Sequence, residues 1–340
     1  MRLSRVLTTI DTHTAGGPTR TLTAGLPALA GESVAAKMEH FRSTYDAVRK
    51  LLMHEPRGHR DMSGAVITEP TDPDADLGVF FMTASGYLPA CVHSSIGVTT
   101  AGLETGFIRS PDRPGGAIRL ETPSGLVAVI PEMKDGSVRS VSLRPAAAFV
   151  HTRSAQLDVG EGRRVEVALA YSGVFFVLVE VEQLGFTPCA SGTPIGPENA
   201  ARFAALGPSV LRAANEAFRV RHPENPAVDS IALAMFHQEA GERHGRDIVV
   251  GPSGGVDRSP CGAGTAAKVA LLFTEGRLGV GEPYVNESFL GTRFVGRALE
   301  PAQVGPFEGA LPEIQGRAFV TGMHQFVLDA ADPLPEGLSF

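Results

Sequence analysis

The sequence has no tryptophan, and it contains three cysteines and four tyrosines in 340 residues. An odd and small number of cysteines in a large chain argues against a disulfide framework and is typical of a reducing compartment, so we expect a cytoplasmic protein. The formal net charge of −7 leaves no basic excess, which argues against a nucleic-acid partner. No apolar run approaches the roughly 20 residues that a membrane-spanning helix needs, and residues 1–7 lack the apolar core of a signal peptide. We therefore expect no membrane partner.

Glycine and proline are plentiful, with 39 and 25 residues, and they indicate many turns and short strands. Apolar residues at helical spacing predict one long helix in each half of the chain, at 32–53 and 197–220. The segment 165–182 is interpreted as one long or bent strand. Further strand patterns lie at 3–10, 64–68, 78–84, 118–130, 141–150, 229–236, 246–250 and 288–328.

Each half has the same order of predicted elements: strands, a long helix, strands, and then a shorter helix, expected at 95–105 and 264–275. This order predicts an α+β protein of two domains, 1–150 and 151–340, with the functional site in the cleft between them. The last strands of the second domain are free to cross back to the first.

Two of the three cysteines stand in similar phrases that lie half a chain apart. Cys91 is followed by Val-His-Ser-Ser-Ile-Gly and Cys261 by Gly-Ala-Gly-Thr-Ala-Ala, so each cysteine precedes small residues and then the apolar run of a predicted helix. A thiol at a helix N-terminus has a lowered pKa because it lies at the positive end of the helix dipole. The unpaired N–H groups there also form a carboxylate site. Two such thiols facing one cleft are suited to moving a proton from one face of a carbon to the other.

A single cysteine is more often a small buried apolar residue than a catalytic group. The repetition of the phrase, in a polar setting rich in glycine and serine, argues against that interpretation for Cys91 and Cys261. Cys189 has no such phrase and is interpreted as an incidental loop thiol. His93 and Asp257 lie close to the two thiols in sequence. They could bind the amine of an amino acid whose carboxylate sits at the helix N-termini, or they could cap a helix or face solvent.

Motifs for other chemistries do not fit their surroundings. Gly251–Gly255 matches the G-x-S-x-G pattern, but Pro260 and the residues before it separate it from the predicted helix, so a nucleophile elbow is not expected. His54 and His59 have the wrong spacing for a zinc-binding helix, and Pro56 forbids helical register there. The sequence has no cysteine pair at metal-ligand spacing, no dinucleotide fingerprint and no phosphate-binding loop. We therefore expect neither a metal nor a cofactor.

Around these residues the chain resembles a known family. The most specific phrase is Asp-Arg-Ser-Pro-Cys-Gly-Ala-Gly-Thr at 257–265, and further phrases lie at 11–16, 18–20, 55–59, 286–288 and 291–294. They are similar to those of the proline racemase family, which also includes hydroxyproline 2-epimerases and trans-3-hydroxyproline dehydratases, and they span essentially the whole chain. The resemblance implies a diaminopimelate epimerase-like fold. In that fold two pseudo-symmetric lobes of mixed or antiparallel sheet each wrap around a central helix, and the active site lies in the interlobe cleft.

The resemblance also implies roles for the residues at the two helix starts. Cys91 and Cys261 would be the paired catalytic acid and base. His93 and Asp257 would hold the ring nitrogen of the substrate. The substrate carboxylate would bind backbone N–H groups, those of Val92, Gly262 and Ala263.

The chain departs from the family pattern beside both thiols. Val92 and Ser94 stand where the family has glycine, and Ala263 stands where it has threonine. These changes concern the identity of the substrate rather than the chemistry. The hydroxyl of Ser94 could meet a 4-hydroxyl group on the substrate ring.

We therefore expect a cofactor-independent isomerase, a 2-epimerase of a proline-type amino acid with 4-hydroxyproline preferred over proline. The alternatives are a proline racemase, a trans-3-hydroxyproline dehydratase, and a binding protein that keeps the fold without catalysis. Family dehydratases typically replace one of the two cysteines by serine or threonine, and a binder needs no pair of thiols, so the intact pair favours the epimerase. The sequence leaves the oligomeric state open, a homodimer included.

Overall fold

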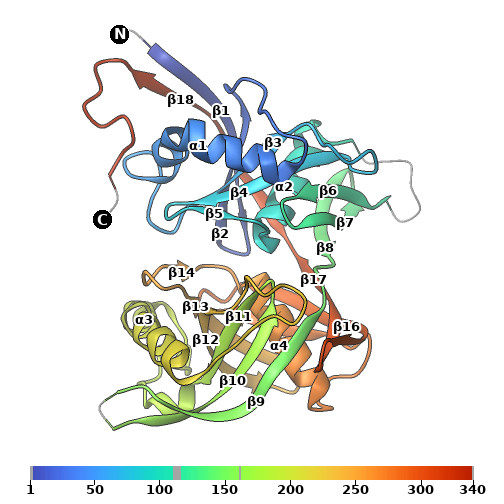
Figure 1. The fold of residues 1–340 in the computed structure, drawn as a ribbon, viewed down its shortest axis with the longest axis vertical. Coiled ribbons are helices and arrows are strands. Elements are labelled where there is room, and N and C mark those ends of the chain that lie inside the picture. Colours follow the sequence, from blue (N-terminus) through green and yellow to red (C-terminus); the bar gives the residue numbers. More distant parts are fainter. Residues whose placement is uncertain (1–2, 110–115, 161, 339–340) are drawn as a thin grey trace. The chain divides into compact units, whose positions relative to one another are not determined.

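The computed structural model describes residues 3–109, 116–160 and 162–338. These residues form two compact units, which Figure 1 shows. Unit 1 takes the chain up to Leu143 and again from Gly316 onward, and unit 2 takes Arg144–Gln315. The chain thus changes unit at Arg144, a few residues before the predicted boundary, and its last segment belongs to unit 1.

In its described residues, unit 1 contains a mixed sheet and two α-helices. Its strands pair in the order β18, β1, β2, β3, β4, β6, β7 and β8, and the two-residue β5 also pairs with β4. The pairs β2–β3 and β4–β6 are parallel and the others are antiparallel. The strands are β1 (Leu3–Thr14), β2 (Gly17–Ala24), β3 (Ser63–Thr68), β4 (Leu77–Thr83), β5 (Tyr87–Leu88), β6 (Ile118–Thr122), β7 (Gly125–Lys134), β8 (Ser137–Leu143) and β18 (Ala318–Asp329). The helices are α1 (Val34–Met53) and α2 (Val92–Thr105).

Unit 2 is built in the same way, and its sheet closes on itself. The strands pair in the order β9, β10, β11, β12, β13, β15, β16 and β17, and β17 pairs again with β9. The pairs β11–β12 and β13–β15 are parallel. The strands are β9 (Ala148–Asp158), β10 (Arg164–Ser172), β11 (Val174–Glu180), β12 (Ile231–Gly241), β13 (His244–Val250), β14 (Val256–Asp257), β15 (Tyr284–Ser288), β16 (Arg293–Val304) and β17 (Phe307–Gly316). The helices are α3 (Ala200–Ala217), α4 (Gly262–Thr274) and two short 3₁₀ turns, η2 (Val181–Leu184) and η3 (Pro197–Asn199).

The two units share one order of elements. Each begins with an antiparallel pair, continues with a long helix, and adds a strand parallel to the second strand of that pair. Each then has an antiparallel strand, a two-residue strand, a helix that starts at a cysteine, and three further strands. In unit 2 the first strand of this pair, β10, also pairs with β9. In unit 1 the corresponding strand, β1, also pairs with β18. This repeat confirms the predicted α+β class, with two lobes of mixed sheet that each contain a central helix.

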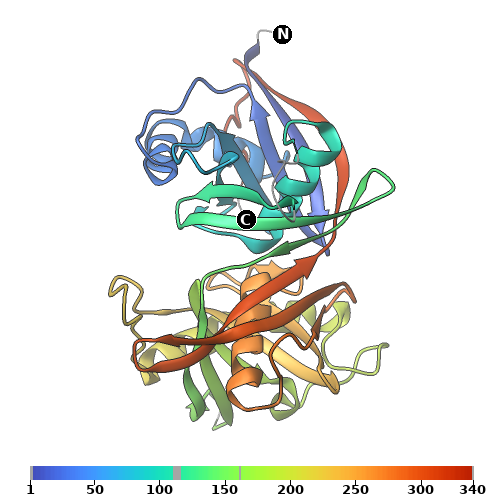
Figure 2. The ribbon, with the colours of Figure 1, turned by 90° about the vertical axis from the view of Figure 1, so that its right-hand side faces the viewer.

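The cysteine helices α2 and α4 are surrounded by strands. Helix α2 packs on β1, β2, β7, β8 and β18, and α4 packs on β9, β10, β11 and β16. Figure 2 shows α4 among the strands of unit 2. In α2, glycines allow neighbouring segments to approach the enclosed helix closely. At Gly97 of α2 an added Cβ would lie 2.6 Å from Thr12 Oγ1, and at Gly102 it would lie 2.4 Å from Ile108 Cδ1. One cluster of large apolar side chains in each unit lies between the sheet and the long helix, α1 in unit 1 and α3 in unit 2.

Three sequence predictions need correction. The segment 165–182 is not one strand but the hairpin β10–β11, because Gly173 adopts a left-handed φ of 73° that reverses the chain. The predicted strand 118–130 is likewise the hairpin β6–β7. The two cysteine helices begin directly after their cysteines, at Val92 and Gly262, so each cysteine is itself the N-cap residue.

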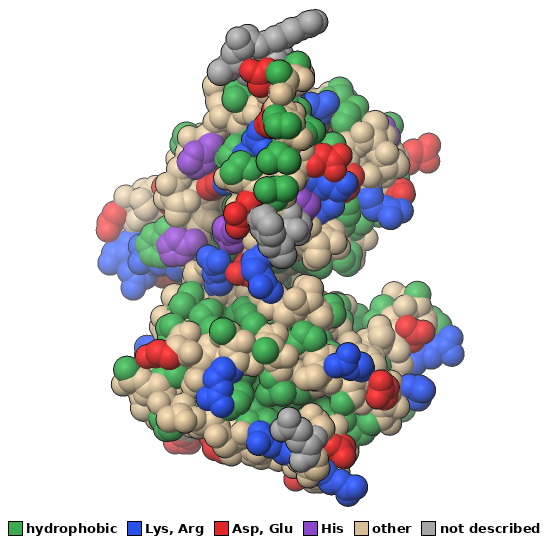
Figure 3. Space-filling model, turned by 90° about the vertical axis from the view of Figure 1, so that its left-hand side faces the viewer, with side chains coloured by type: hydrophobic (Ala, Val, Ile, Leu, Met, Phe, Trp, Pro, Cys, Tyr) green, Lys and Arg blue, Asp and Glu red, His purple; other side chains and the backbone are tan. Residues whose placement is uncertain are grey.

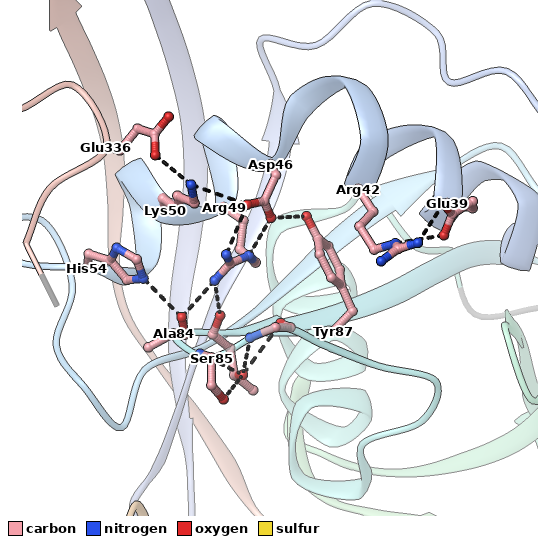
Figure 4. A network of polar contacts seen from close by, with 12 residues as sticks. Glu39, Arg42, Asp46, Arg49, Lys50, His54, Ala84, Ser85, Tyr87 and Glu336 are labelled. Atoms are coloured by element: carbon pink, nitrogen blue, oxygen red, sulfur yellow. Dashed lines mark hydrogen bonds and ion pairs between the residues drawn. The ribbon is translucent and has the colours of Figure 1, made fainter. Parts of the chain in front are cut away.

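Helix α1 holds the β4–β5 hairpin in place, as Figure 4 shows. Arg49 donates to the carbonyl groups of Thr83 at 3.1 Å and Ala84 at 2.7 Å. Its guanidinium also pairs with Asp46, which accepts a hydrogen bond of 2.7 Å from the Tyr87 hydroxyl. Because β5 directly precedes the loop to α2, this network fixes the chain that leads to the first cysteine.

Candidate active site

Cys91 lies at the start of α2 with an extended backbone, φ −154° and ψ 114°. Its carbonyl oxygen accepts hydrogen bonds from the Ser95 N–H at 2.9 Å and the Ser95 hydroxyl at 2.8 Å, which closes the first turn of the helix. Cys91 as a whole is partly exposed, and its sulfur has two polar neighbours. His93 Nδ1 lies 3.5 Å from it and Ser94 Oγ lies 3.2 Å from it.

These neighbours determine the acidity of the Cys91 thiol. Burial by itself would raise its pKa, because a thiolate loses solvation. The positive charge of His93 and the hydrogen bonds from His93 and Ser94 outweigh burial and hold the pKa below its ordinary value of 9.0. Cys91 is therefore the thiol that is more readily present as a thiolate, the form that accepts a proton.

Cys261 lies at the start of α4 in a different conformation. Its φ of 52° falls in the left-handed region that favours glycine. The side chain is 6% exposed, and the sulfur accepts a hydrogen bond of 3.3 Å from the Gly264 N–H. The peptide before it is held from two sides, since the Pro260 carbonyl oxygen accepts from the Thr265 hydroxyl at 3.0 Å and from Asn286 Nδ2 at 3.1 Å. Strained backbone of this kind persists where the surroundings hold it and is common at functional sites.

The pKa of the Cys261 thiol is displaced in the opposite direction. Burial raises it well above its ordinary value, and the negative charge of Asp257 raises it further. The hydrogen bond from Gly264 lowers it, but by less. Cys261 is therefore a protonated thiol at neutral pH, the form that donates a proton.

Asp257 lies in β14 and shapes the turn into α4. Its Oδ1 accepts hydrogen bonds from the Ser259 N–H at 2.9 Å and the Ser259 hydroxyl at 2.8 Å. The Ser259 hydroxyl oxygen in turn accepts one of 3.2 Å from the Cys261 N–H. Asp257 is a partly exposed residue. Asp257 thus shapes the loop before α4 without capping the helix, whose N-cap residue is Cys261, and its role toward a substrate stays a prediction.

The predicted site residues fall into two groups, one in each unit. In unit 1 the structure brings Val92, His93 and Ser94 together in the first turn after Cys91; Val92 and His93 are partly exposed, whereas Ser94 is buried. In unit 2 it brings Gly262 and Ala263 together after Cys261, with Ala263 partly exposed.

Ser94 has partners inside unit 1. Besides its contact with the Cys91 sulfur, its Oγ accepts a hydrogen bond of 3.1 Å from the Thr19 hydroxyl, and both side chains are fully buried. The prediction that Ser94 meets a hydroxyl group of the substrate therefore competes with contacts that the side chain already makes.

Several polar residues that support the segments next to the two cysteines were not predicted from the sequence. In unit 1 the Thr14 hydroxyl donates to the His93 carbonyl oxygen at 2.7 Å. In unit 2 the buried Asp247 accepts a hydrogen bond of 2.8 Å from Asn286 Nδ2. Burial raises the pKa of Asp247 well above its ordinary value, although the Asn286 hydrogen bond opposes this. The phrases at 11–16 and 286–288 contain Thr14 and Asn286, and these phrases were the signal by which they could have been found.

The motifs that sequence analysis rejected are also unsuitable in the structure. Gly251–Gly255 forms a turn between β13 and β14, and His54 is the residue at which α1 ends. Among the described residues no group of three or more His, Cys, Asp and Glu side chains is placed to hold a metal ion. Cys189 contacts Asn199 Nδ2 at 3.3 Å, and burial raises the pKa of its thiol.

Two general properties bear on possible partners. In the described part of the chain, no helix has both the length and the apolar character that crossing a bilayer requires. Acidic and basic side chains are interspersed on the face drawn in Figure 3.

Comparisons with known proteins agree on one family. The proline racemase family model matches residues 9–339. The chain is 39% identical over 338 residues to a 4-hydroxyproline 2-epimerase of Streptosporangium roseum, with 99% of each chain covered. It is 36% identical over 342 residues to a proline racemase of Acetoanaerobium sticklandii, with 100% of each covered. Among solved structures it is similar to a hydroxyproline epimerase of Agrobacterium vitis with bound trans-4-hydroxy-L-proline, with a TM-score of 0.87, 32% identity, and 100% and 97% of the two chains covered.

Proposed function

Because the chain belongs to the proline racemase family and is an isomerase of the racemase and epimerase type, we propose that it is a cofactor-independent 2-epimerase of a proline-type amino acid, with 4-hydroxyproline preferred. One observation carries the proposal. Two cysteines, one in each unit, stand at the starts of central helices, and their surroundings move the two pKa values in opposite directions. A reaction that removes a proton from one face of a carbon and adds one to the other face needs such a base and such an acid.

In the proposed reaction the Cys91 thiolate removes the Cα proton. The Cα–H bond breaks, an S–H bond forms at Cys91, and the electron pair stays on Cα beside the carboxylate. The Cys261 thiol then gives its proton to the opposite face, so that a new Cα–H bond forms and Cys261 becomes the thiolate. The reverse reaction uses the same two groups with their roles exchanged.

The substrate carboxylate is proposed to bind backbone N–H groups at the two helix starts, those of Val92, Gly262 and Ala263. The first turn of a helix leaves such groups without intrahelical partners, and the helix dipole adds positive potential there. This environment also stabilises the negative charge that develops when the Cα proton leaves. His93 and Asp257 are proposed to hold the ring nitrogen; the partial exposure of both side chains is consistent with this.

The preference for 4-hydroxyproline is supported by relatives that are named for this substrate and by the similar solved structure that holds trans-4-hydroxy-L-proline. Relatives that are called 4-hydroxyproline epimerase and relatives that are called proline racemase match at similar identity, 39% and 36% in the two cases above, so proline racemase is the alternative. A trans-3-hydroxyproline dehydratase is the alternative of another class. The retention of both cysteines argues against it, because elimination of a 3-hydroxyl needs no second thiol to invert Cα.

The experiment is an incubation in heavy water. The purified protein receives, in separate tubes, trans-4-hydroxy-L-proline, L-proline and trans-3-hydroxy-L-proline, and the products are followed by proton NMR and polarimetry. We expect Cα deuteration with inversion, most efficiently for 4-hydroxyproline. Greater efficiency on proline would identify the protein as a proline racemase. Water loss from the 3-hydroxy compound with formation of a ring imine would identify it as a dehydratase. No reaction at all would indicate a binding protein.

A further inference from the structure

A chain of two hydroxyl groups leads from β2 to the Cys91 sulfur. Thr19 Oγ1 donates to Ser94 Oγ at 3.1 Å, and Ser94 Oγ lies 3.2 Å from Cys91 Sγ. Both hydroxyl side chains are 0% exposed, so water does not reach them to substitute for either partner. Thr19 is distant from Cys91 in sequence and comes into this chain through the packing of β2 on α2.

The direction of these hydrogen bonds depends on the charge of the sulfur. A hydroxyl has one proton to donate and two lone pairs that accept. As a thiol, Cys91 donates to Ser94 Oγ. A Cys91 thiolate has no proton, so the hydroxyl of Ser94 must then become the donor. Thr19 donates to the Ser94 oxygen in the observed geometry, and this leaves the Ser94 proton free to point at the sulfur. A hydroxyl that accepts one hydrogen bond is also a better donor in the next.

The backbone around these hydroxyl groups allows β1 and β2 to lie close to α2. The absence of a side chain at Gly97 lets the threonines of β1 and β2 approach α2, because an added Cβ would lie 2.6 Å from Thr12 Oγ1 and 3.4 Å from Thr19 Oγ1. The Thr14 hydroxyl ties the His93 carbonyl group to β1 at 2.7 Å. The first turn of α2 is therefore attached to the antiparallel pair β1–β2, immediately next to the Cys91 thiol.

We propose that Thr19 is a positioning residue that orients the Ser94 hydroxyl as a donor to the Cys91 thiolate, and that Ser94 tunes the base rather than reading the ring of the substrate. The inference rests on the proposed function in one respect, namely that Cys91 is the base. Of the two side chains within hydrogen-bonding distance of the sulfur, Ser94 has no titratable group, so removal of its hydroxyl changes the pKa of Cys91 without removing a titratable neighbour.

The test measures the reactivity of Cys91 without any substrate. In a full-length background with Cys189→Ser and Cys261→Ser, Cys91 is the one remaining thiol, and its alkylation by iodoacetamide is followed from pH 5 to 10. Only the thiolate reacts. A hydrogen bond to a charged group corresponds to a pKa difference of about 1–2, so Ser94→Ala should slow alkylation at pH 6 by about 10-fold or more.

Thr19→Val should slow the same reaction by about 3-fold, since it leaves Ser94 in place but without its orienting partner. Thr19→Ser, which keeps the hydroxyl, should restore the parent rate. The matched control is Thr21→Val: Thr21 is also on β2 and 0% exposed, and its hydroxyl has no hydrogen-bond partner among the described residues. It should leave the pH profile unchanged.

A folded Thr19→Val variant with the parent profile would overturn the proposal, as would a Thr21→Val variant with the same loss. If Thr19→Val does not fold, Thr19→Ala removes the same hydroxyl without adding bulk and is judged by the same profile. Failure of the proposed function is a separate result. Absence of epimerisation in the wild-type protein would refute that function, whereas the alkylation profile would still report on the hydroxyl chain.

Discussion

The opposite displacement of the two thiol pKa values predicts that the Cys91→Ser and Cys261→Ser variants fail in different ways. Both should lose inversion, because a serine hydroxyl is a far weaker base and acid near neutral pH than a tuned thiol. They should differ in the first half of the reaction, the exchange of the Cα proton with solvent. The Cys261→Ser variant keeps Cys91, a base whose pKa is lowered. The Cys91→Ser variant keeps Cys261, a thiol whose pKa is raised.

The size of the difference follows from the thiolate fractions. A thiol at its ordinary pKa of 9.0 is about 1% ionised at pH 7. Cys91 lies above this fraction and Cys261 below it, and the ratio grows about tenfold for each pKa unit between them. The Cys261→Ser variant should therefore exchange the Cα proton of one enantiomer of 4-hydroxyproline for deuterium without inverting it. The Cys91→Ser variant should exchange the other enantiomer at least about tenfold more slowly at pH 7.

The assay is the loss of the Cα proton signal in heavy water by NMR, with each enantiomer offered separately to each variant. Cys189→Ser serves as the control and should match the wild-type protein. Equal exchange rates in the two variants, or faster exchange in Cys91→Ser, would refute the assignment of Cys91 as the resting base. Inversion in either variant would refute the two-base mechanism itself.

Three further outcomes are expected. Asp257→Asn should lower the pKa of Cys261, because the Asp257 charge is the largest cause after burial that raises this pKa. Alkylation of a protein with Cys261 as its sole thiol should then begin at lower pH. An unchanged pH profile would show that Asp257 does not raise the pKa of Cys261. Asp11→Ala should lower the free energy of unfolding by about 3–5 kcal/mol in urea titrations, because it leaves the buried Arg20 guanidinium, now 2.8 Å from Asp11 Oδ2, without its counter-charge. Glu39→Ala, which removes an exposed ion pair, is the control and should cost less than about 1 kcal/mol, and equal losses would contradict the argument. Dialysis against a chelator should leave activity unchanged, and activity that is lost and then restored by a metal ion would contradict the cofactor-independent proposal.

The fold and the two thiol positions could be predicted because they depend on local signals. Small residues followed by an apolar run mark a helix start wherever they occur, so Cys91 and Cys261 were placed shortly before two helices from the sequence alone. The helices begin earlier than predicted, directly after each cysteine. The repeated order of strands and helices indicated two similar lobes for the same reason. The local signals were weaker at turns, and the hairpin at Gly173 was missed because an apolar run on both sides of a single glycine resembles one continuous strand.

The sequence by itself therefore determined which residues stand at the two helix starts and which family phrases surround them. Only the tertiary structure decided what each thiol touches. Thr19 meets Ser94 because β2 packs on α2, and Asn286 of β15 holds the Pro260 carbonyl group just before Cys261. The pKa directions follow from these long-range contacts and from burial, which depend on how distant segments pack and not on neighbours along the chain. Two similar cysteine phrases thus acquire opposite acidities because the surroundings that the fold supplies to them differ.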